Sequence, residues 1–242
     1  MDKENYKSEI SLMNNHWWYV SRKQILKNIL DQYIEIGKEL NILEIGCGSG
    51  GNLKFLSKYG NLNALELDDN ARAHATSKNI CKVDYGRLPL DIPFDKRFDI
   101  ICIFDVLEHI EEDILSLKTI YEYLNKGGKI ILTVPAYMFL WSKHDVFSHH
   151  KRRYNMNQIN KMLKSTGFNV KYSSYFNFLL FPMILAIRLL EKITQFDLRE
   201  NDLQQENEIV NYLFKKLFSL ESKLLPQLSV PFGMSIVSIG IK

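Results

Sequence analysis

The feature that most constrains the fold is an alternation of short apolar runs and helical patterns between residues 41 and 134. The apolar runs are rich in Ile, Leu and Val, and each is followed by glycine, proline or an acidic residue: 41–45, 62–67, 80–83, 98–104 and 129–134. Strands that alternate with helices build βαβ units, in which the crossover helix returns the chain so that the next strand runs parallel. The pattern therefore predicts an α/β fold, a doubly wound Rossmann-like sheet that is mostly parallel.

The pattern changes after residue 135. Residues 135–156 show no period and hold three histidines and a basic cluster, which is typical of a functional loop. Next come a short helix, a strand, a long helical stretch and a final strand that we expect to be antiparallel. We expect a single domain with five parts: an N-terminal helical segment (1–40), the alternating core (41–135), a loop, helix and strand (136–176), a helical insertion (177–230) and the last strand (231–242).

Composition and charge exclude several classes of protein. Lys and Arg number 31 against 28 Asp and Glu, and the net charge of +3 is too small to indicate nucleic-acid binding. Three widely spaced cysteines form neither a disulfide framework nor a zinc motif. The longest apolar run has ten residues, fewer than the ~20 that a spanning helix needs. Since the charged N-terminus also lacks a signal peptide, we expect a cytoplasmic protein with a small-molecule substrate. The sequence leaves its oligomeric state open.

A glycine-rich loop follows the first expected strand. Gly46, Gly48 and Gly51 fit the pattern G-x-G-x-x-G, and Glu66 lies 20 residues beyond Gly46. In such loops glycine lets backbone N–H groups approach a nucleotide at a helix N-terminus, and a following carboxylate binds the ribose. A Gly48→Val change is therefore predicted to abolish ligand binding without unfolding the chain. The glycines alone would equally suit an NAD-dependent oxidoreductase, or a tight turn with no ligand.

Further motifs indicate one family. The stretch L-E-I-G-C-G-S-G (43–50) carries an acid two residues before its first glycine, which NAD enzymes do not require. It resembles motif I of the class I S-adenosylmethionine-dependent methyltransferases. Residues 64–68, 98–110 and 124–135 are similar to the second, fourth and fifth strands of that family, in the same order and at proper spacing. The resemblance implies that the chain uses S-adenosyl-L-methionine as its cofactor.

The same resemblance implies a set of cofactor-binding residues: Glu44, Gly46, Cys47, Gly48, Gly50, Glu66, Leu67, Asp84 and Asp105. Glu44 and the glycine backbone are expected at the methionine end of the cofactor, Glu66 at the ribose and Leu67 against the adenine. The identity of the acid near the adenine depends on which of two X-Pro pairs, Leu88-Pro89 or Ile92-Pro93, is aligned with the L-P dipeptide of the family. One alignment selects Asp84, and the other leaves that position to backbone groups such as Gly86.

Segments outside the core resemble a bacterial subgroup of these enzymes that often acts in envelope or surface-polysaccharide pathways. They are the aromatic stretch 16–19 with Arg22, and residues 149–154, 175–178 and 231–235. The aromatic stretch is expected to form a lid that excludes water, with Trp18 and Arg22 touching the substrate, or to pack against the sheet edge. The apolar stretch 176–190 suits a buried helix that walls the acceptor site, which we favour, or a helix on a membrane surface.

Four residues are candidates for catalysis: His109, His149, His150 and Tyr154. Methyl transfer is an in-line displacement from a sulfonium, and a hydroxyl acceptor also needs a general base. His109 lies just past the end of the fourth strand, where such sheets bind ligands, and it either takes that proton or stabilises the turn. We expect no metal site, because the adjacent residues His149 and His150 point apart on a strand and no acidic ligand pattern accompanies them.

A basic cluster follows these histidines. Arg152 and Arg153, with Lys151, are expected to bind an anionic acceptor, because cations beside a sulfonium repel it unless an anion joins them. The alternative is an ordinary solvated charge run. The sequence thus predicts O-methylation of a small phosphorylated or sugar-nucleotide-linked acceptor in capsule or envelope glycan biosynthesis. Alternatives are a lipid or quinone acceptor at a membrane surface, an NAD-dependent oxidoreductase, and a cofactor-binding scaffold without activity.

Overall fold

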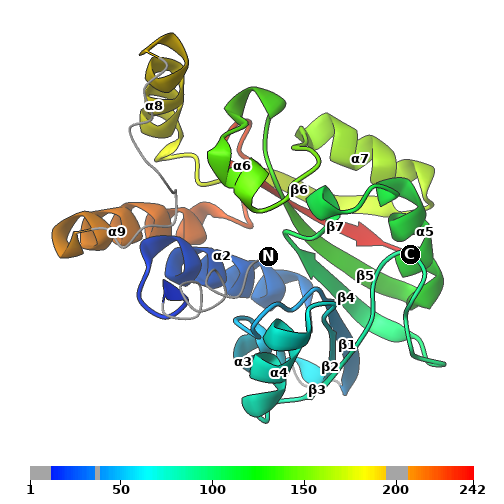
Figure 1. Cartoon of the computed structure of the whole chain (residues 1–242). Helices are drawn as coiled ribbons and strands as arrows, with labels where there is room; N and C mark the ends of the chain where they lie inside the picture. Colours follow the sequence, from blue (N-terminus) through cyan, green and yellow to red (C-terminus); the bar gives the residue numbers. More distant parts are fainter. Residues whose placement is uncertain (1–11, 36–38, 195–206) are drawn as a thin grey trace.

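The computed structural model describes residues 12–35, 39–194 and 207–242. Within these ranges the centre is a seven-stranded sheet with the order β3-β2-β1-β4-β5-β7-β6 (Figure 1). Strands β1 to β5 pair in parallel, and β7 runs antiparallel between β5 and β6. The predicted doubly wound, mostly parallel sheet is confirmed. The strands are β1 (Leu40–Ile45), β2 (Gly60–Leu65), β3 (Lys82–Asp84), β4 (Phe98–Phe104), β5 (Leu124–Pro135), β6 (Asn169–Phe176) and β7 (Ser235–Ile241).

Helices cover both faces of this sheet. Figure 1 shows α5 and α7 on one side and α2 and α9 on the other. Side chains alternate between the two layers along each strand, so that Ile42 packs with α2 while Leu43 packs with α5 and α7. The helices are α2 (Trp17–Tyr33), α3 (Leu53–Leu56), α4 (Asp69–Ser77), α5 (Asp113–Tyr123), α6 (Lys143–Phe147), α7 (Met156–Ser165), α8 (Phe181–Thr194) and α9 (Glu208–Leu224), with 3-10 turns η1 (Leu107–His109) and η2 (Met138–Leu140).

Several boundaries differ from those expected from the sequence. β2 begins at Gly60 rather than at residue 62, and a Cβ at that glycine would lie 2.2 Å from the Leu40 carbonyl oxygen of the neighbouring strand. β5 extends back to Leu124, which pairs with Phe98 ahead of a bulge. Both differences arise from pairing between strands, which the local pattern does not encode.

Helices α2 and α9 lie side by side although most of the chain separates them. The Trp17 amide donates to Asn211 Oδ1 over 2.7 Å, and Asn28 Nδ2 donates to the Ser222 carbonyl over 2.6 Å. Because the residue numbers rise together along the two helices, the helices run in the same direction. The segments expected to be an N-terminal lid and a helical insertion therefore share one helical layer.

Helix α8 projects from the body of the molecule at the top of Figure 1. The sequence predicted a helix over 176–190, but β6 includes Phe176 and α8 begins at Phe181. Phe176 is fully buried, whereas Leu189 and Leu190 are half exposed. α8 therefore presents apolar side chains to solvent, unlike a helix packed on the sheet. Among the described residues, no helix is long and apolar enough to cross a membrane.

Candidate active site

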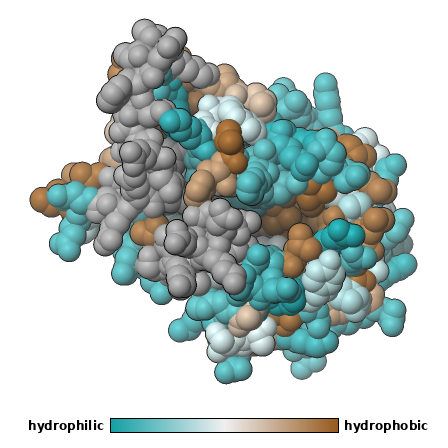
Figure 2. Space-filling view, viewed as in Figure 1, coloured by the Kyte–Doolittle hydropathy of each residue, from teal (hydrophilic) through white to brown (hydrophobic). Residues whose placement is uncertain are grey.

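A cleft of about 1080 Å³ opens at the carboxyl ends of the central strands. It is lined by the loops that follow β1, β2 and β4, by the segment 144–153, and by side chains of α2 and α8. Figure 2 shows apolar residues in the hollow between the upper and lower parts of this face. The strand order reverses between β1 and β4, which is where doubly wound sheets bind their ligands.

The glycine loop forms one side of the cleft. Gly48 has a φ of +54°, and a Cβ there would meet no protein atom within 4 Å. Its N–H donates to Glu66 Oε2 over 2.7 Å, and the Asp68 N–H donates to Oε1 over 2.9 Å. The residues of this side that line the cleft are Gly46, Cys47, Gly48 and Glu66. An open glycine cradle beside a fixed carboxylate fits a nucleoside cofactor.

The positive φ of Gly48 adds a stability cost to the Gly48→Val change. A valine there is strained, because a β-branched side chain is disfavoured in the left-handed region. The cost to folding is about 1–2 kcal/mol, which is small beside the stability of an ordinary domain, so we still expect the variant to fold.

The expected adenine side is formed by Leu67 and by residues 86–88, which all line the cleft. Leu67 is 52% exposed, so a flat ligand can cover it. Asp84 does not line the cleft, because it ends the edge strand β3 and its side chain pairs with Lys82 over 2.9 Å. The structure thus contradicts the placement of Asp84 at the cofactor. It agrees with the alternative alignment, in which backbone near Gly86 takes that position.

Two residues expected at the methionine end lie behind the loop. Glu44 is 1% exposed, and its Oε1 accepts a hydrogen bond from Asn52 Nδ2 over 2.8 Å. Burial raises the pKa of Glu44 to about 7. Gly50 also lies off the cleft, and a Cβ there would press on Leu53 and Ala75. Glu44 therefore reaches the cleft only through Asn52, which lines it, and Gly50 serves packing.

Arg22 and Asp105 form an ion pair that lines the cleft. Arg22 Nη2 lies 2.5 Å from Asp105 Oδ2 and donates to Thr133 Oγ1 over 3.1 Å. Thr133 Oγ1 donates in turn to Asp105 Oδ1 over 2.9 Å. Trp18 also lines the cleft and stacks on Phe218 with ring centroids 5.5 Å apart. α2 is thereby fastened to the ends of β4 and β5, and the charge of Arg22 is neutralised within the protein.

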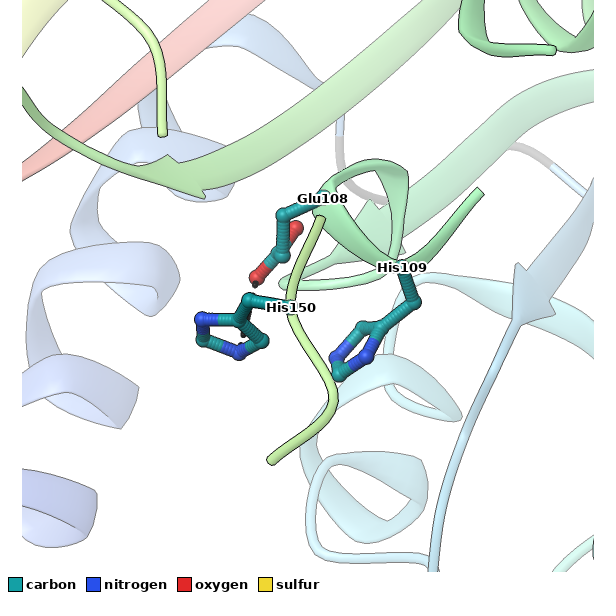
Figure 3. Close-up of side chains that lie close together, drawn as sticks. All are labelled: Glu108, His109 and His150. Carbon is teal, nitrogen blue, oxygen red and sulfur yellow. Dashed lines mark ion pairs between the residues drawn. The ribbon is translucent and has the colours of Figure 1, made fainter. Parts of the chain in front are cut away.

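Glu108, His109 and His150 lie together just past β4 (Figure 3). The first two belong to η1, and His150 comes from the loop after α6. The imidazole centroids of His109 and His150 are 4.7 Å apart, and His150 Nε2 lies 4.0 Å from Glu108 Oε1. All three residues line the cleft, and His149 lies exposed at its margin. The structure therefore brings together two of the predicted catalytic histidines and adds an unexpected glutamate.

The members of this cluster differ in their protonation. Burial and the neighbouring His150 lower the pKa of His109 to about 4, although solvent reaches its ring from the cleft. Burial and Asp105 raise the pKa of Glu108 well above its usual range. A histidine with so low a pKa is neutral at pH 7 and is a weak base, so His109 alone does not suit the general-base role expected of it.

Asp145 orients His150. Its Oδ1 lies 2.8 Å from His150 Nδ1 and accepts a hydrogen bond from Arg153 Nε over 2.8 Å. Burial opposes the ionisation of Asp145, but hydrogen bonds from His150 and Arg153 outweigh it and lower its pKa. Neither Asp145 nor Glu108 was predicted from the sequence as a site residue. A capping box, Ser142-x-x-Asp145, marks the first of them, whereas Glu108 has no such local signal.

The basic cluster is neutralised by carboxylates. Lys151 Nζ lies 3.0 Å from Glu111, and Arg152 lies 3.2 Å from Glu111 and 3.0 Å from Asp113. Arg153 is buried and pairs with Asp145. Arg152 does not line the cleft. The premise of an uncompensated cationic patch is therefore wrong. Acidic residues of the η1–α5 segment supply the countercharge that we expected from an acceptor.

Tyr154 lies away from the cleft. Its hydroxyl is 3.1 Å from Asp113 Oδ2 and 3.3 Å from the Leu107 carbonyl oxygen, and the residue is 4% exposed. Burial and Asp113 raise its pKa above the usual range. The structure thus contradicts a catalytic role for Tyr154 and gives it a structural one, which is to hold η1 in place.

A doubly wound sheet with a glycine cradle and an adjoining cleft defines a protein that binds a nucleoside-type cofactor. Residues 17–173 match the family described as a methyltransferase domain. The chain belongs to this family: it is a class I S-adenosylmethionine-dependent methyltransferase, and S-adenosylmethionine is its cofactor. This overturns the alternative of an NAD-dependent oxidoreductase.

Individual relatives are more distant. A ubiquinone biosynthesis O-methyltransferase of Rickettsia bellii is 32% identical over 118 residues, which are 46% of this chain and 48% of the relative. The chain thus matches about half the length of this curated relative. The structure of the plantazolicin methyltransferase BpumL with a monoazolic desmethylPZN analogue and SAH has a TM-score of 0.62 at 15% identity, covering 100% of this chain and 90% of that one. A TehB-like SAM-dependent methyltransferase from Corynebacterium glutamicum has a TM-score of 0.55 at 16% identity, covering 90% and 87%. At such identities these structures support the fold alone.

Proposed function

We propose that the enzyme transfers a methyl group from S-adenosylmethionine to a hydroxyl oxygen of an acceptor with an apolar body. The observation that carries this proposal is the Glu108–His109–His150 cluster beside the cofactor side of the cleft. A neutral hydroxyl must lose its proton as the carbon–oxygen bond forms. Because Asp145 occupies Nδ1 of His150, Nε2 is left as the atom that can act on the hydroxyl.

The walls of the cleft support an apolar acceptor body. Met183, Ile184 and Ile187 of α8 line it, as does Phe214 of α9, and Trp18 lies on the α2 side. These side chains form the part of the cleft that the cofactor motifs do not use. An aromatic or isoprenoid-like body would bury apolar surface there, at roughly 25 cal/mol per Å². The name of the Rickettsia bellii relative, a ubiquinone biosynthesis O-methyltransferase, is consistent with such an acceptor.

Exposed apolar side chains on α8 and α9 support the membrane-surface alternative that the sequence left open. Leu189 and Leu190 are about half exposed on α8, and Ile209, Tyr212 and Leu213 are 54–70% exposed on α9. Figure 2 shows apolar residues at the projecting end of α9. An enzyme that takes its acceptor from a bilayer would place such residues at the headgroup level.

The anionic glycan acceptor has less support. Its physical argument was a cationic patch beside the sulfonium, and carboxylates compensate that patch. What remains is the resemblance of the outer segments to an envelope-associated subgroup, which concerns the pathway and not the chemistry of the site.

The proposal is tested by incubating the purified chain with methyl-labelled S-adenosylmethionine and two acceptor panels. One panel holds phenols and catechols with and without alkyl chains, and the other holds sugar nucleotides and sugar phosphates. We expect label on a phenolic oxygen, with kcat/KM rising as the alkyl chain lengthens. Transfer to the sugar panel alone would contradict the proposal. The variant His150→Asn is expected to retain cofactor affinity and lose at least ~100-fold in kcat, whereas the matched control His74→Asn keeps both.

A further inference from the structure

Glu108 is a buried carboxyl group without a conventional partner. Its side chain is 0% exposed, and no other described residue donates a hydrogen bond to either oxygen. A buried carboxyl group that lacks partners is costly, so such groups in native proteins have a proton, a water or a cation to explain them. The nearest polar atom of the cluster is His150 Nε2, 4.0 Å from Oε1.

His150 is arranged as a metal-binding histidine is arranged. Asp145 Oδ1 lies 2.8 Å from Nδ1, which fixes the tautomer that carries its proton there and leaves the lone pair of Nε2. Asp145 is itself fixed by Arg153 Nε at 2.8 Å and by the Ser142 amide at 2.8 Å. A carboxylate–imidazole pair with such an anchored carboxylate is the usual outer shell of a metal ligand.

His109 completes the set from the opposite side. Its imidazole meets the ring of His150 edge to face, with the two ring centroids 4.7 Å apart. One ligand atom from each of Glu108, His109 and His150 lies within 4.8 Å of the others, and Figure 3 shows the side chains gathered at one point from η1 and the loop after α6.

We propose that Glu108, His109 and His150 form a binding site for a divalent transition-metal cation. Two imidazoles and one carboxylate suit zinc and its first-row neighbours, whereas magnesium and calcium prefer all-oxygen sites. Three protein ligands with a remaining position open to solvent are the pattern of a catalytic zinc site rather than a structural one. The open position faces the cleft, because all three ligands line it.

The distances require the three ligand atoms to draw together on binding. Ligands at about 2.0–2.2 Å from a tetrahedral zinc lie about 3.3 Å from one another. The 4.0 Å between His150 Nε2 and Glu108 Oε1 must therefore shorten, and separations of up to 4.8 Å within the set must shorten by as much as about 1.5 Å. No hydrogen bond from another described residue holds the Glu108 carboxyl group, so none has to break when that side chain turns toward the cation.

With a cation on His150 Nε2, the cation takes over from that imidazole the task of activating the acceptor hydroxyl, and this consequence rests on the proposed function. An acceptor hydroxyl that takes the open position loses its proton to solvent at lower pH, because the cation stabilises the alkoxide or phenoxide. The oxygen then forms a bond to the methyl carbon while the carbon–sulfur bond breaks. The electron pair of that bond remains on sulfur, which leaves as the neutral thioether S-adenosylhomocysteine.

Metal binding is tested without any acceptor. The chain is freed of metal with a chelator, dialysed and titrated with zinc chloride by calorimetry. We expect one zinc per chain, and we expect Glu108→Gln and His150→Ala each to weaken binding at least ~100-fold. Loss of the outer-shell carboxylate in Asp145→Asn is expected to weaken it roughly 10–100-fold. His74→Ala, which removes a histidine outside the cleft, serves as the matched control and is expected to bind like the wild type.

Binding of S-adenosylhomocysteine reports in each variant that the chain is folded. If folded wild-type chain binds no zinc below ~10 µM, or if Glu108→Gln and His150→Ala bind it as the wild type does, the metal site is refuted and Glu108 is simply protonated. These outcomes are separate from those of the acceptor panels. Zinc binding without transfer to a phenol contradicts only the proposed function, and transfer that survives complete zinc removal contradicts only the metal.

Discussion

The two sides of the cleft are built in opposite ways. On the cofactor side, the loops after β1 and β2 use backbone N–H groups and one carboxylate, as in the hydrogen bond from Gly48 to Glu66. On the acceptor side, the working groups are side chains fixed by ion pairs between distant segments, as in Arg22 with Asp105 and Arg153 with Asp145. Cofactor affinity should therefore depend on the space around the backbone of the cofactor side. Turnover of the acceptor should depend on the countercharges of the acceptor side.

The largest effect is expected from Gly48→Val, which tests the backbone character of the cofactor side. The new side chain enters the space next to the cofactor, so affinity for S-adenosylhomocysteine should fall more than ~100-fold. Gly127→Val is the matched control, because Gly127 also has a positive φ and open space at its Cβ but does not line the cleft. Both variants should lose about 1–2 kcal/mol of stability in thermal unfolding. Equal affinities in the two variants would contradict the placement of the cofactor.

Glu66→Ala comes next. It removes the carboxylate that we expect to accept a charge-assisted hydrogen bond from the ribose, a bond worth about 1.5–3 kcal/mol, or roughly 10–150-fold in affinity. Asp84→Ala removes an acid near the end of the adjacent strand that does not line the cleft, and calorimetry should give it the affinity of the wild type. A large loss of cofactor affinity in Asp84→Ala would instead support the alignment that places Asp84 near the adenine.

The third comparison is between two neighbouring arginines on the acceptor side. Arg153→Lys keeps the charge but loses the bond that orients Asp145, so acceptor kcat/KM should fall about 10-fold while cofactor affinity stays constant. Arg152→Ala removes a partly exposed pair with Glu111 and Asp113, and the effect should stay below about 3-fold. The reverse order would show that Arg152 contacts the acceptor after all.

The smallest effect concerns the exposed face of α9. Replacing Leu213 and Leu217 by Glu should lower the fraction of chain that floats with anionic liposomes by a few fold, because their apolar area no longer enters the interface. Transfer to a water-soluble phenol should not change, since neither residue lines the cleft. Leu115→Glu on α5 is the control. Flotation that does not respond to the α9 changes would place membrane contact elsewhere or exclude it.

The sequence revealed the cofactor side well for a physical reason. A backbone cradle needs glycine at fixed spacing between a strand and a helix, so consecutive residues such as Gly46, Cys47 and Gly48 identify it. Even here three predicted residues do not line the cleft. The directions of the Asp84 and Glu44 side chains depend on a neighbour, Lys82 in one case and burial with Asn52 in the other, and Gly50 packs against Leu53 and Ala75.

The acceptor side was harder to predict because its partners are far apart in the chain. Arg152 looked like part of an uncompensated cluster, and the acid that pairs with it lies 39 residues earlier. His150 was predicted to be catalytic, but its neighbour Glu108 was not, since the fold alone brings η1 and the loop after α6 together. The sequence therefore identified residue types that take part in chemistry without identifying which of them meet.

The pairing of α2 with α9 has a consequence for the order in which the chain matures. Ser21 meets Ser219 across 198 residues, so this contact cannot form until residue 219 has left the ribosome. Contacts of such high sequence separation pay a large loop-closure entropy and are among the slowest to form. The strands that frame the glycine loop, β1, β2 and β4, all lie between residues 40 and 104, so their pairing closes much shorter stretches of chain. We therefore expect the wall that α2 gives to the cleft to be completed after the sheet that carries the glycine loop.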